Sequence, residues 1–324
     1  MLVFSLILTG CGQGESKEEA AQTEEKSDTG SETNKEEATP ASYTVEHAMG
    51  TTTIEGTPEK VVILTNEGTE ALLSMGVKPV GAVSSWSPAE GSDFYAHIKD
   101  QMEGVTAVGQ ESSVNLEAIA ALQPDLIIGN KLRQEEIYEQ LNKIAPTVFA
   151  ETLKGDWKLN FELYAKALNK EAEGQKVMAD FDARVAEIKE NAGDKLTTEI
   201  SIIRFMADHV RIYLKDTFAG TILEQIGFAR PEAQNVEDFM IKAGKEQIPQ
   251  MEGDIIFYFT YAPPGETDAL NNEEEWLKDP LFQNLEAVKA GNIHKVDDSI
   301  WNTAGGVIAA NLFLDDLEKF FLEQ

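Results

Sequence analysis

Residues 114–128 read VNLEAIAALQPDLII, a short helical pattern that gives way after Pro124 to an apolar run typical of a buried strand. Residues 243–257 read AGKEQIPQMEGDIIF and keep the same order of helix and strand. Three positions match between the two copies: Glu117, Ile119 and Asp125 in the first, and Glu246, Ile248 and Asp254 in the second. This repeated unit favours two similar lobes, each built from alternating helices and strands.

Strand and helix patterns alternate on both sides of this unit. Short β-branched runs predict strands at residues 61–64, 79–83, 126–129, 146–149, 200–205, 210–213, 254–258 and 293–296. Helical periodicity predicts helices at about 67–75, 116–122, 135–142, 218–226 and 307–322. The alternation is typical of an α/β fold with mainly parallel sheets and helices on both faces of each sheet.

The two lobes are expected to be joined by a helix. Residues 156–192 are rich in Ala, Glu, Lys and Leu, and they carry one apolar face. Gly174 is the position at which this helix could divide, because glycine is costly inside a helix. The sequence therefore predicts an N-terminal lobe over 43–155, a long interlobe helix over 156–192 and a C-terminal lobe over 193–324. A ligand cleft is expected between the lobes, where the strands of both sheets end.

The charge and composition exclude several classes of function. The 324 residues contain 27 Lys and Arg against 57 Asp and Glu, a net charge of −30 that repels nucleic acids. The single cysteine, Cys11, excludes an internal disulfide and any multi-cysteine metal centre. Four scattered histidines do not have the spacing of a metal site. No nucleophile-elbow, phosphate-loop or dinucleotide motif occurs, so we expect no enzyme.

The N-terminal residues look like an export signal. Residues 1–10 are mostly apolar, and Leu8-Thr9-Gly10-Cys11 resembles a bacterial lipobox. This resemblance implies a signal segment over 1–11 that ends in the lipobox cysteine, with cleavage before Cys11 and lipid on its sulfur; the alternative is a buried strand with a chance cysteine. Residues 12–42 hold nine acidic residues, three lysines and no aromatic or large aliphatic side chain, so we expect a disordered acidic tether.

Several motifs together resemble one family of transport proteins. They are Thr57-Pro58-Glu59-Lys60-Val61-Val62, Asn115-Leu116-Glu117-Ala118-Ile119, Pro124-Asp125-Leu126-Ile127, Asp279-Pro280-Leu281-Phe282 and Trp301-Asn302. The chain resembles the substrate-binding lipoproteins of bacterial iron-siderophore ABC importers, a group whose two lobes share a rigid helical connection. Residues 203–231 are similar to Gram-positive members for hydroxamate or citrate-hydroxamate siderophores.

This resemblance implies a function outside the cytoplasm. A lipid-anchored, monomeric protein on the outer side of the cell membrane would capture a ferric siderophore and deliver it to an ABC permease and its ATPase. Fe(III) would arrive only inside the chelate, with no intrinsic cofactor and no metal site. The alternative cargoes on the same fold are haem and cobalamin, and Tyr258 or Tyr261 could supply a haem ligand.

Candidate ligand-binding residues follow from charge, aromatic character and position. A charge inside the apolar strand at 200–205 favours a cleft-facing Arg204, with a salt bridge as the alternative. The resemblance implies cleft positions for Arg133 or its neighbour Lys131 and for Trp301 and Asn302. The remaining candidates are Arg211, Trp86, Tyr258, Tyr261 and Asn66; for the aromatics the alternative is core packing, and for Asn66 a helix cap.

Two glutamates occupy equivalent places in the repeated unit. Glu117 and Glu246 each lie in the first turn of a predicted helix, where a carboxylate stabilises the helix dipole. The resemblance implies a second role for this pair, in docking onto arginines of the permease.

Overall fold

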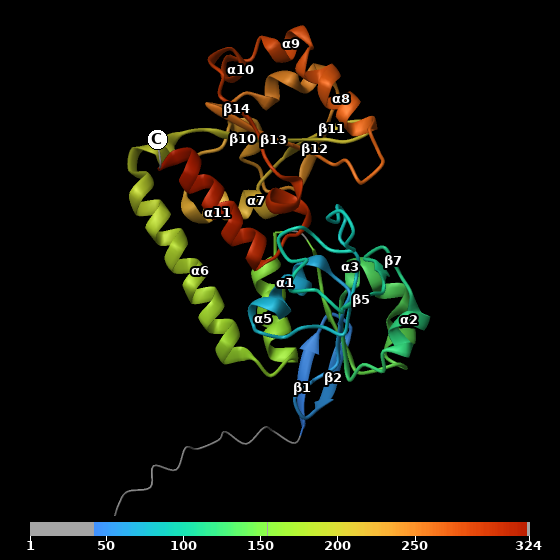
Figure 1. Ribbon diagram of the computed structural model, residues 1–324. Coiled ribbons are helices and arrows are strands. Elements are labelled where there is room, and N and C mark those ends of the chain that lie inside the picture. The colour runs from blue at the N-terminus through green and yellow to red at the C-terminus, as the bar shows by residue number, and fades with distance from the viewer. Residues whose placement is uncertain (1–41, 154, 323–324) are drawn as a thin grey trace, which may run out of the picture. The chain divides into compact units, whose positions relative to one another are not determined.

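The computed structural model describes residues 42–153 and 155–322 (Figure 1). The predicted signal peptide, Cys11 and all but the last residue of the predicted tether lie outside the described residues. That last residue, Ser42, belongs to a strand, so the tether was predicted one residue too long. Strands β1 (Ser42–His47) and β2 (Gly50–Glu55) form an antiparallel hairpin that the sequence patterns did not predict.

A five-stranded parallel sheet forms the centre of the N-terminal lobe. Its order is β5-β4-β3-β8-β9, with every neighbouring pair parallel. The strands are β3 (Val61–Ile63), β4 (Gly81–Ala82), β5 (Thr106–Ala107), β8 (Leu126–Asn130) and β9 (Thr147–Ala150). The four predicted strands of this lobe are confirmed. Beside the sheet, β6 (Gly109–Gln110) and β7 (Ser113–Val114) form a short hairpin.

The helices of this lobe follow strand ends. Thr65 caps α1 (Asn66–Ser74) by accepting a hydrogen bond from the Gly68 amide, and Asn115 caps α2 (Leu116–Ala121) in the same way. The helix predicted over 135–142 is divided into two short helical pieces. The structure has α3 (Lys131–Gln134), a 3-10 turn (η1, Glu135–Ile137) and α4 (Tyr138–Leu141). Asn130 caps α3 directly after β8, so the helical segment begins earlier and is divided into short pieces.

The interlobe helix is divided in two, as the sequence allowed, but the break does not lie at Gly174. The structure has α5 (Trp157–Ala167) and α6 (Glu171–Ala192), and the break lies at Asn169, which has a left-handed backbone with φ of 54°. Gly174 does not break α6. It lies where α6 contacts α5, and a Cβ atom there would come within 2.7 Å of the Ala165 Cβ atom. Its lack of a side chain therefore serves close packing of the two helices.

The sheet of the C-terminal lobe is mixed: four of its strands run in one direction, in line with the predicted mainly parallel sheet, and one runs against them. Its order is β12-β11-β10-β13-β14; the β10–β13 and β13–β14 pairs are parallel, and β11 runs antiparallel to both of its neighbours, β10 and β12. The strands are β10 (Ile200–Phe205), β11 (Val210–Tyr213), β12 (Met240–Ala243), β13 (Ile255–Thr260) and β14 (Ile293–Lys295). The four residues between β10 and β11 are too few for a crossover, so these strands pair antiparallel.

Helices cover both faces of this second sheet. They are α7 (Phe218–Ile226), α8 (Asp268–Leu277), α9 (Pro280–Gln283), α10 (Glu286–Ala290) and α11 (Val307–Phe321). Shorter turns are η2 (Gly193–Thr197), η3 (Glu232–Gln234), η4 (Lys245–Met251) and η5 (Ser299–Thr303), the last a π-turn. The predicted helices at 218–226 and 307–322 are confirmed. The repeated helix-then-strand unit is α2 with β8 in one lobe and η4 with β13 in the other, so its second helix is of the 3-10 type.

One hydrophobic core runs through both lobes. It contains Leu72 of α1, Phe161 of α5, Phe181 of α6, Ile222 of α7 and Phe313 of α11, together with one face of each sheet. Separate clusters fill the outer faces of the two sheets. Figure 1 shows α6 running beside both lobes with α11 against it, and α1 also packs on α11. The α/β class and the helical connection between lobes are confirmed.

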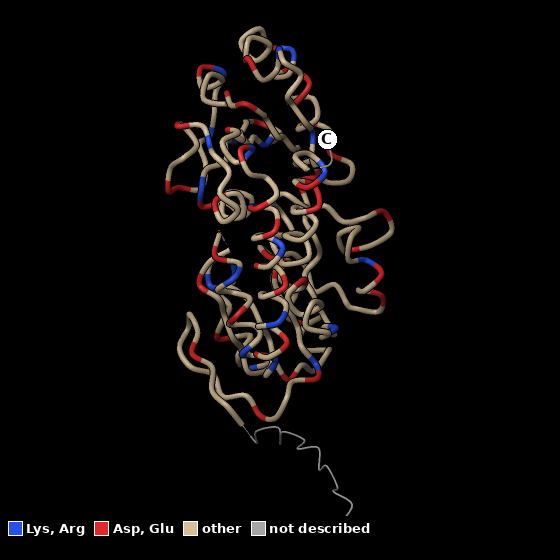
Figure 2. The backbone as a smooth tube through the Cα atoms, turned by 90° about the vertical axis from the view of Figure 1, so that its left-hand side faces the viewer, with Lys and Arg blue, Asp and Glu red and all other residues tan. Residues whose placement is uncertain are grey.

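Acidic residues are spread along the chain in both lobes (Figure 2). Within the residues that the structure describes, no helix is both long enough and apolar enough to cross a membrane.

Candidate ligand-binding cavity

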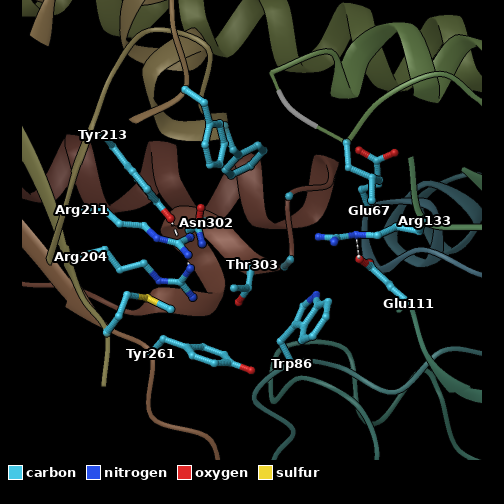
Figure 3. Close-up of a pocket in the computed structure, with 16 residues that line it drawn as sticks. Glu67, Trp86, Glu111, Arg133, Arg204, Arg211, Tyr213, Tyr261, Asn302 and Thr303 are labelled. Carbon is cyan, nitrogen blue, oxygen red and sulfur yellow. Dashed lines mark hydrogen bonds and ion pairs between the residues drawn. The ribbon is translucent and has the colours of Figure 1, made fainter. Parts of the chain in front are cut away.

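A cavity of about 340 Å³ lies between the two lobes. From the N-terminal lobe it is lined by Glu67 at the start of α1, Trp86 after β4, Glu111 after β6 and Arg133 on α3. From the C-terminal lobe and the connecting segments it is lined by Leu153, Arg204, Met206, Arg211, Tyr213, Phe218, Phe239, Tyr261, Asn302, Thr303, Ala304 and Gly305. Figure 3 shows side chains from both lobes pointing toward the same space.

Arg204 is the most deeply held cation of the cavity. Its guanidinium group forms an ion pair with Asp298, with Nε 2.6 Å from Oδ1 and Nη2 2.9 Å from Oδ2. Nη1 donates to the Tyr213 hydroxyl at 3.2 Å, and the guanidinium carbon lies 4.8 Å from the centre of the Tyr261 ring. Burial opposes the charge of Arg204, but Tyr213 and Asp298 outweigh it and raise the pKa of the guanidinium. The group therefore stays charged at the cavity wall.

Arg211 is held in place by a chain of polar contacts. Its Nε donates to Nε2 of His209 at 3.1 Å, and Nδ1 of His209 lies 2.6 Å from an oxygen of Asp208. These contacts fix the stem of the guanidinium group and leave its two terminal nitrogens toward the cavity (Figure 3). Arg204 and Arg211 lie on neighbouring strands in directly paired positions. They therefore present two positive charges side by side.

Arg133 faces these two arginines from the opposite wall. Its Nε lies 3.9 Å from an oxygen of Glu111, and its guanidinium carbon lies 5.8 Å from the centre of the Trp86 ring. The Arg133 side chain is 41% exposed, so much of the group is open to a ligand. Three guanidinium groups from two lobes therefore surround one cavity, an arrangement suited to oxygen anions.

Two buried carboxyl groups complete the N-terminal wall. Glu111 accepts hydrogen bonds from the backbone and side-chain nitrogens of Asn66 at 2.7 and 2.9 Å. Burial raises the pKa of Glu111, although Asn66 and Arg133 oppose this shift. Glu67 accepts hydrogen bonds from Tyr164 at 2.8 Å and Asn160 at 2.7 Å. Burial raises the pKa of Glu67 to about 8, so this group is mostly uncharged at neutral pH.

Comparison with known proteins agrees with a ligand-binding role for this cavity. Residues 61–299 match the model of the family described as "Periplasmic binding protein". The chain belongs to this family. It is 50% identical to the probable siderophore-binding lipoprotein YfiY of Bacillus subtilis, over 99% of this chain and 96% of that protein. It is 28% identical to the Fe(3+)-citrate-binding protein YfmC of the same organism, over 98% and 94% of the two chains.

A solved structure shares both sequence and fold with this periplasmic binding protein. It is that of Staphylococcus aureus SirA complexed with staphyloferrin B, which is 36% identical with a TM-score of 0.79. The match covers 86% of this chain and 97% of SirA.

Six of the ten predicted ligand-binding residues of this periplasmic binding protein line the cavity. They are Trp86, Arg133, Arg204, Arg211, Tyr261 and Asn302. For Arg204, the sequence predicts either a side chain that faces the cleft or one that forms a salt bridge. The structure shows both at once, because Asp298 holds the guanidinium group at the cavity wall.

The other four lie elsewhere. Trp301 was expected in the pocket but is fully buried in the core, where its Nε1 donates to Asp316 at 2.8 Å. Tyr258 faces the outer layer of the sheet, because side chains alternate along β13, and its ring packs on Phe205. Asn66 supports Glu111 instead of facing the cavity. Lys131 pairs with Glu151 at 2.8 Å and lines a neighbouring cavity.

Several cavity residues were not among the predicted site residues. Tyr213 and Met206 could have been found from their positions at the ends of the strands that carry Arg211 and Arg204. Glu111 and Phe239 lie in loops and Thr303 ends η5, none of them with a local signal, and only the folded chain brings them to the cavity.

Glu117 and Glu246 occupy equivalent positions, each the second residue of its helix. Both are exposed, and within the described residues neither forms an ion pair. They do not line the cavity, so any role of theirs concerns the outer surface of the lobes.

The described residues contain no group of three or more His, Cys, Asp and Glu side chains that could hold a metal ion. The cavity offers cations, aromatic rings and hydroxyl groups instead.

Proposed function

We propose that this protein captures a negatively charged ferric siderophore outside the cytoplasm and delivers it to an ABC permease for iron uptake. The observation that carries the proposal is the meeting of Arg133, Arg204 and Arg211 in one interlobe cavity. A ferric siderophore already surrounds its metal with oxygen donors. The protein therefore has to recognise an anionic, partly apolar shell, and it needs no catalytic group to do so.

Within the siderophores, the cavity favours the citrate-hydroxamate class over purely hydroxamate chelates. Free carboxylates of a citrate unit would find partners in the guanidinium groups, whereas a neutral hydroxamate chelate would leave Arg211, which forms no ion pair with another described residue, without a counter-charge. The names of YfmC and of the SirA complex support an anionic chelate. Haem is less well supported, because Tyr258 does not reach the cavity and the Tyr261 ring is covered by Arg204.

Replacement of Arg211 by glutamine tests this function. We expect Arg211→Gln to weaken binding of ferric aerobactin, a citrate-hydroxamate chelate, by about tenfold or more, as expected for a lost charged hydrogen bond. Lys242→Gln is the matched control, because Lys242 pairs with Arg211 across the strands but does not line the cavity. Equal affinity of both variants for this chelate would contradict the proposal.

The location and the docking partner are further parts of the proposal. The lipobox and the lipoprotein name of YfiY support lipid attachment at Cys11. Labelled palmitate should then enter the wild-type protein and not a Cys11→Ala variant.

For docking onto the permease, the exposure of Glu117 and Glu246 supports a surface role. The double variant Glu117→Arg with Glu246→Arg should lose iron uptake while it binds its chelate normally. Unchanged uptake would exclude this role.

A further inference from the structure

Glu67 lies at the cavity wall with one oxygen atom engaged and the other free. Both hydrogen bonds that its carboxyl group accepts, from Asn160 and Tyr164, end on Oε1. Among the described residues, no hydrogen bond or ion pair reaches Oε2. Glu67 is 6% exposed and lines the cavity. Its position on α1 and its contacts with α5 therefore fix Oε2 at the cavity, although this oxygen has no hydrogen-bond partner among the described residues.

The surroundings of Glu67 disfavour a negative charge. From α5 it faces the Tyr164 hydroxyl and, near the start of that helix, Asp156; across the cavity wall it faces Glu111. Arg133 is the cation on this wall, and its recorded ion pair is with Glu111. On the other side of α1, α11 brings a backbone amide to Glu70 and no charged side chain to Glu67. Glu67 therefore has no counter-ion within the described residues.

We propose that Glu67 meets the bound chelate as a neutral carboxylic acid and donates a hydrogen bond from Oε2 to an oxygen atom of the chelate. This inference rests on the proposed function and deepens it by adding a specificity-determining residue. On the wall opposite Arg204 and Arg211, a neutral acid supplies one more donor without repelling an anion. A chelate with a carboxylate or carbonyl oxygen at this place is favoured over one that presents an ammonium group.

The raised pKa of about 8 supports this protonation state at neutral pH. Loss of the proton at higher pH would remove the donor and place an unpaired negative charge next to an anionic ligand. Affinity should therefore fall as the pH rises through 8. The guanidinium group of Arg204, whose pKa is raised by Tyr213 and Asp298, does not produce such a change.

The test measures the dissociation constant of ferric aerobactin at pH 7, 8 and 9 for three proteins. For the wild type, linkage to a group with a pKa of about 8 predicts binding about tenfold weaker at pH 9 than at pH 7. Glu67→Gln keeps an acceptor for Tyr164 and a donor for the ligand, so its affinity should vary less than about twofold over this range. Glu162→Gln, which removes an exposed acid from the same helix as Tyr164, should behave as the wild type.

Three results would overturn the inference. A Glu67→Gln protein that keeps the wild-type pH dependence shows that another group titrates. Tighter binding of the wild type at pH 9 shows an ionised Glu67 that recognises a cation. If the wild type does not bind the chelate at pH 7, the proposed function fails together with the inference. The first two results, in contrast, overturn only the role of Glu67. Circular dichroism at each pH shows that the variants are folded.

Discussion

Arg204 is a buried cation whose position depends on one carboxylate. Its side chain is 6% exposed and that of Asp298 is 8% exposed, and the two groups make two close contacts. A buried ion pair of this kind contributes little net stability compared with apolar residues, but removal of one partner leaves an uncompensated charge. The pair is therefore better explained by the need for a fixed positive charge at the cavity.

We predict that stability and binding can be separated at this pair. Arg204→Met alone should destabilise the fold by about 3–5 kcal/mol, because Asp298 is left buried and unpaired. The double variant Arg204→Met with Asp298→Asn should regain most of that stability. It should still bind ferric aerobactin about tenfold to a hundredfold more weakly than the wild type, while its affinity for the neutral chelate ferrichrome changes little.

Urea unfolding and ligand titration of the same samples check this prediction. A double variant that recovers both stability and affinity for the anionic chelate would show that Arg204 serves the fold alone.

Single residues also show where sequence reasoning reaches its limit. Arg204 could be predicted, because a charge in an apolar strand needs an explanation that the strand itself does not offer. Trp86 and Trp301 could not be told apart, since both follow strands in polar loops. Trp301 lies in the core because of Phe257 and Phe313, with ring centres 4.6 and 4.4 Å away, and because of Asp316. These contacts join distant parts of the chain, and no local pattern records them.

At the scale of elements, local signals decided which predictions held. Helix α7 was predicted at its observed bounds because both ends are marked in the sequence: Thr217 accepts a hydrogen bond from Gly220, and Gly227 ends the helix with φ of 101°. Strand β12 was missed because it is only partly buried and exists through its pairing with β11. The break between α5 and α6 was misplaced because an asparagine, and not the nearby glycine, adopts the left-handed backbone.

The contact between α5 and α6 leads to a stability prediction. Alanine at position 174 would ordinarily stabilise a helix by about 1 kcal/mol relative to glycine. Here the added Cβ atom would lie 2.7 Å from the Ala165 Cβ atom and 3.4 Å from atoms of Met75 and Phe161. We therefore expect Gly174→Ala to destabilise the protein by about 1–3 kcal/mol through overpacking.

Thermal and urea unfolding measure this effect, and Ala165→Gly provides the companion change. The double variant Gly174→Ala with Ala165→Gly should recover part of the loss, because the two positions exchange their roles in one contact. If Gly174→Ala increased the free energy of unfolding, α5 and α6 would be able to move apart enough for the added Cβ atom without loss of stability.

At the scale of the whole described chain, the shared core ties the lobes together. Glu70 of α1, fully buried, accepts a hydrogen bond from the Ala309 backbone at the start of α11 at 2.8 Å, and His97 contacts its other oxygen at 2.6 Å. Gly306 permits this approach, since a Cβ atom there would lie 2.6 Å from a Glu70 oxygen. Polar and apolar contacts therefore both hold α1 against α11.

This connection predicts a small change of shape on ligand binding. Opening the lobes widely would expose the continuous core of α1, α5, α6 and α11, which is costly in water. We expect the radius of gyration from small-angle X-ray scattering to stay the same within error when ferric aerobactin is added. A decrease of several ångströms would show a wide hinge, and the shared core would then have to divide between the lobes.

The central claim is that the arginine-lined cavity captures an anionic ferric siderophore, and a titration of the purified protein tests it most directly. Ferric aerobactin, ferric citrate, ferrichrome, haem and cobalamin would be added in turn while heat and tryptophan fluorescence are recorded. The account predicts saturable binding of one molecule of ferric aerobactin per chain, weaker binding of neutral ferrichrome and no comparable binding of haem or cobalamin. Binding of haem or cobalamin with no response to any iron chelate would contradict it.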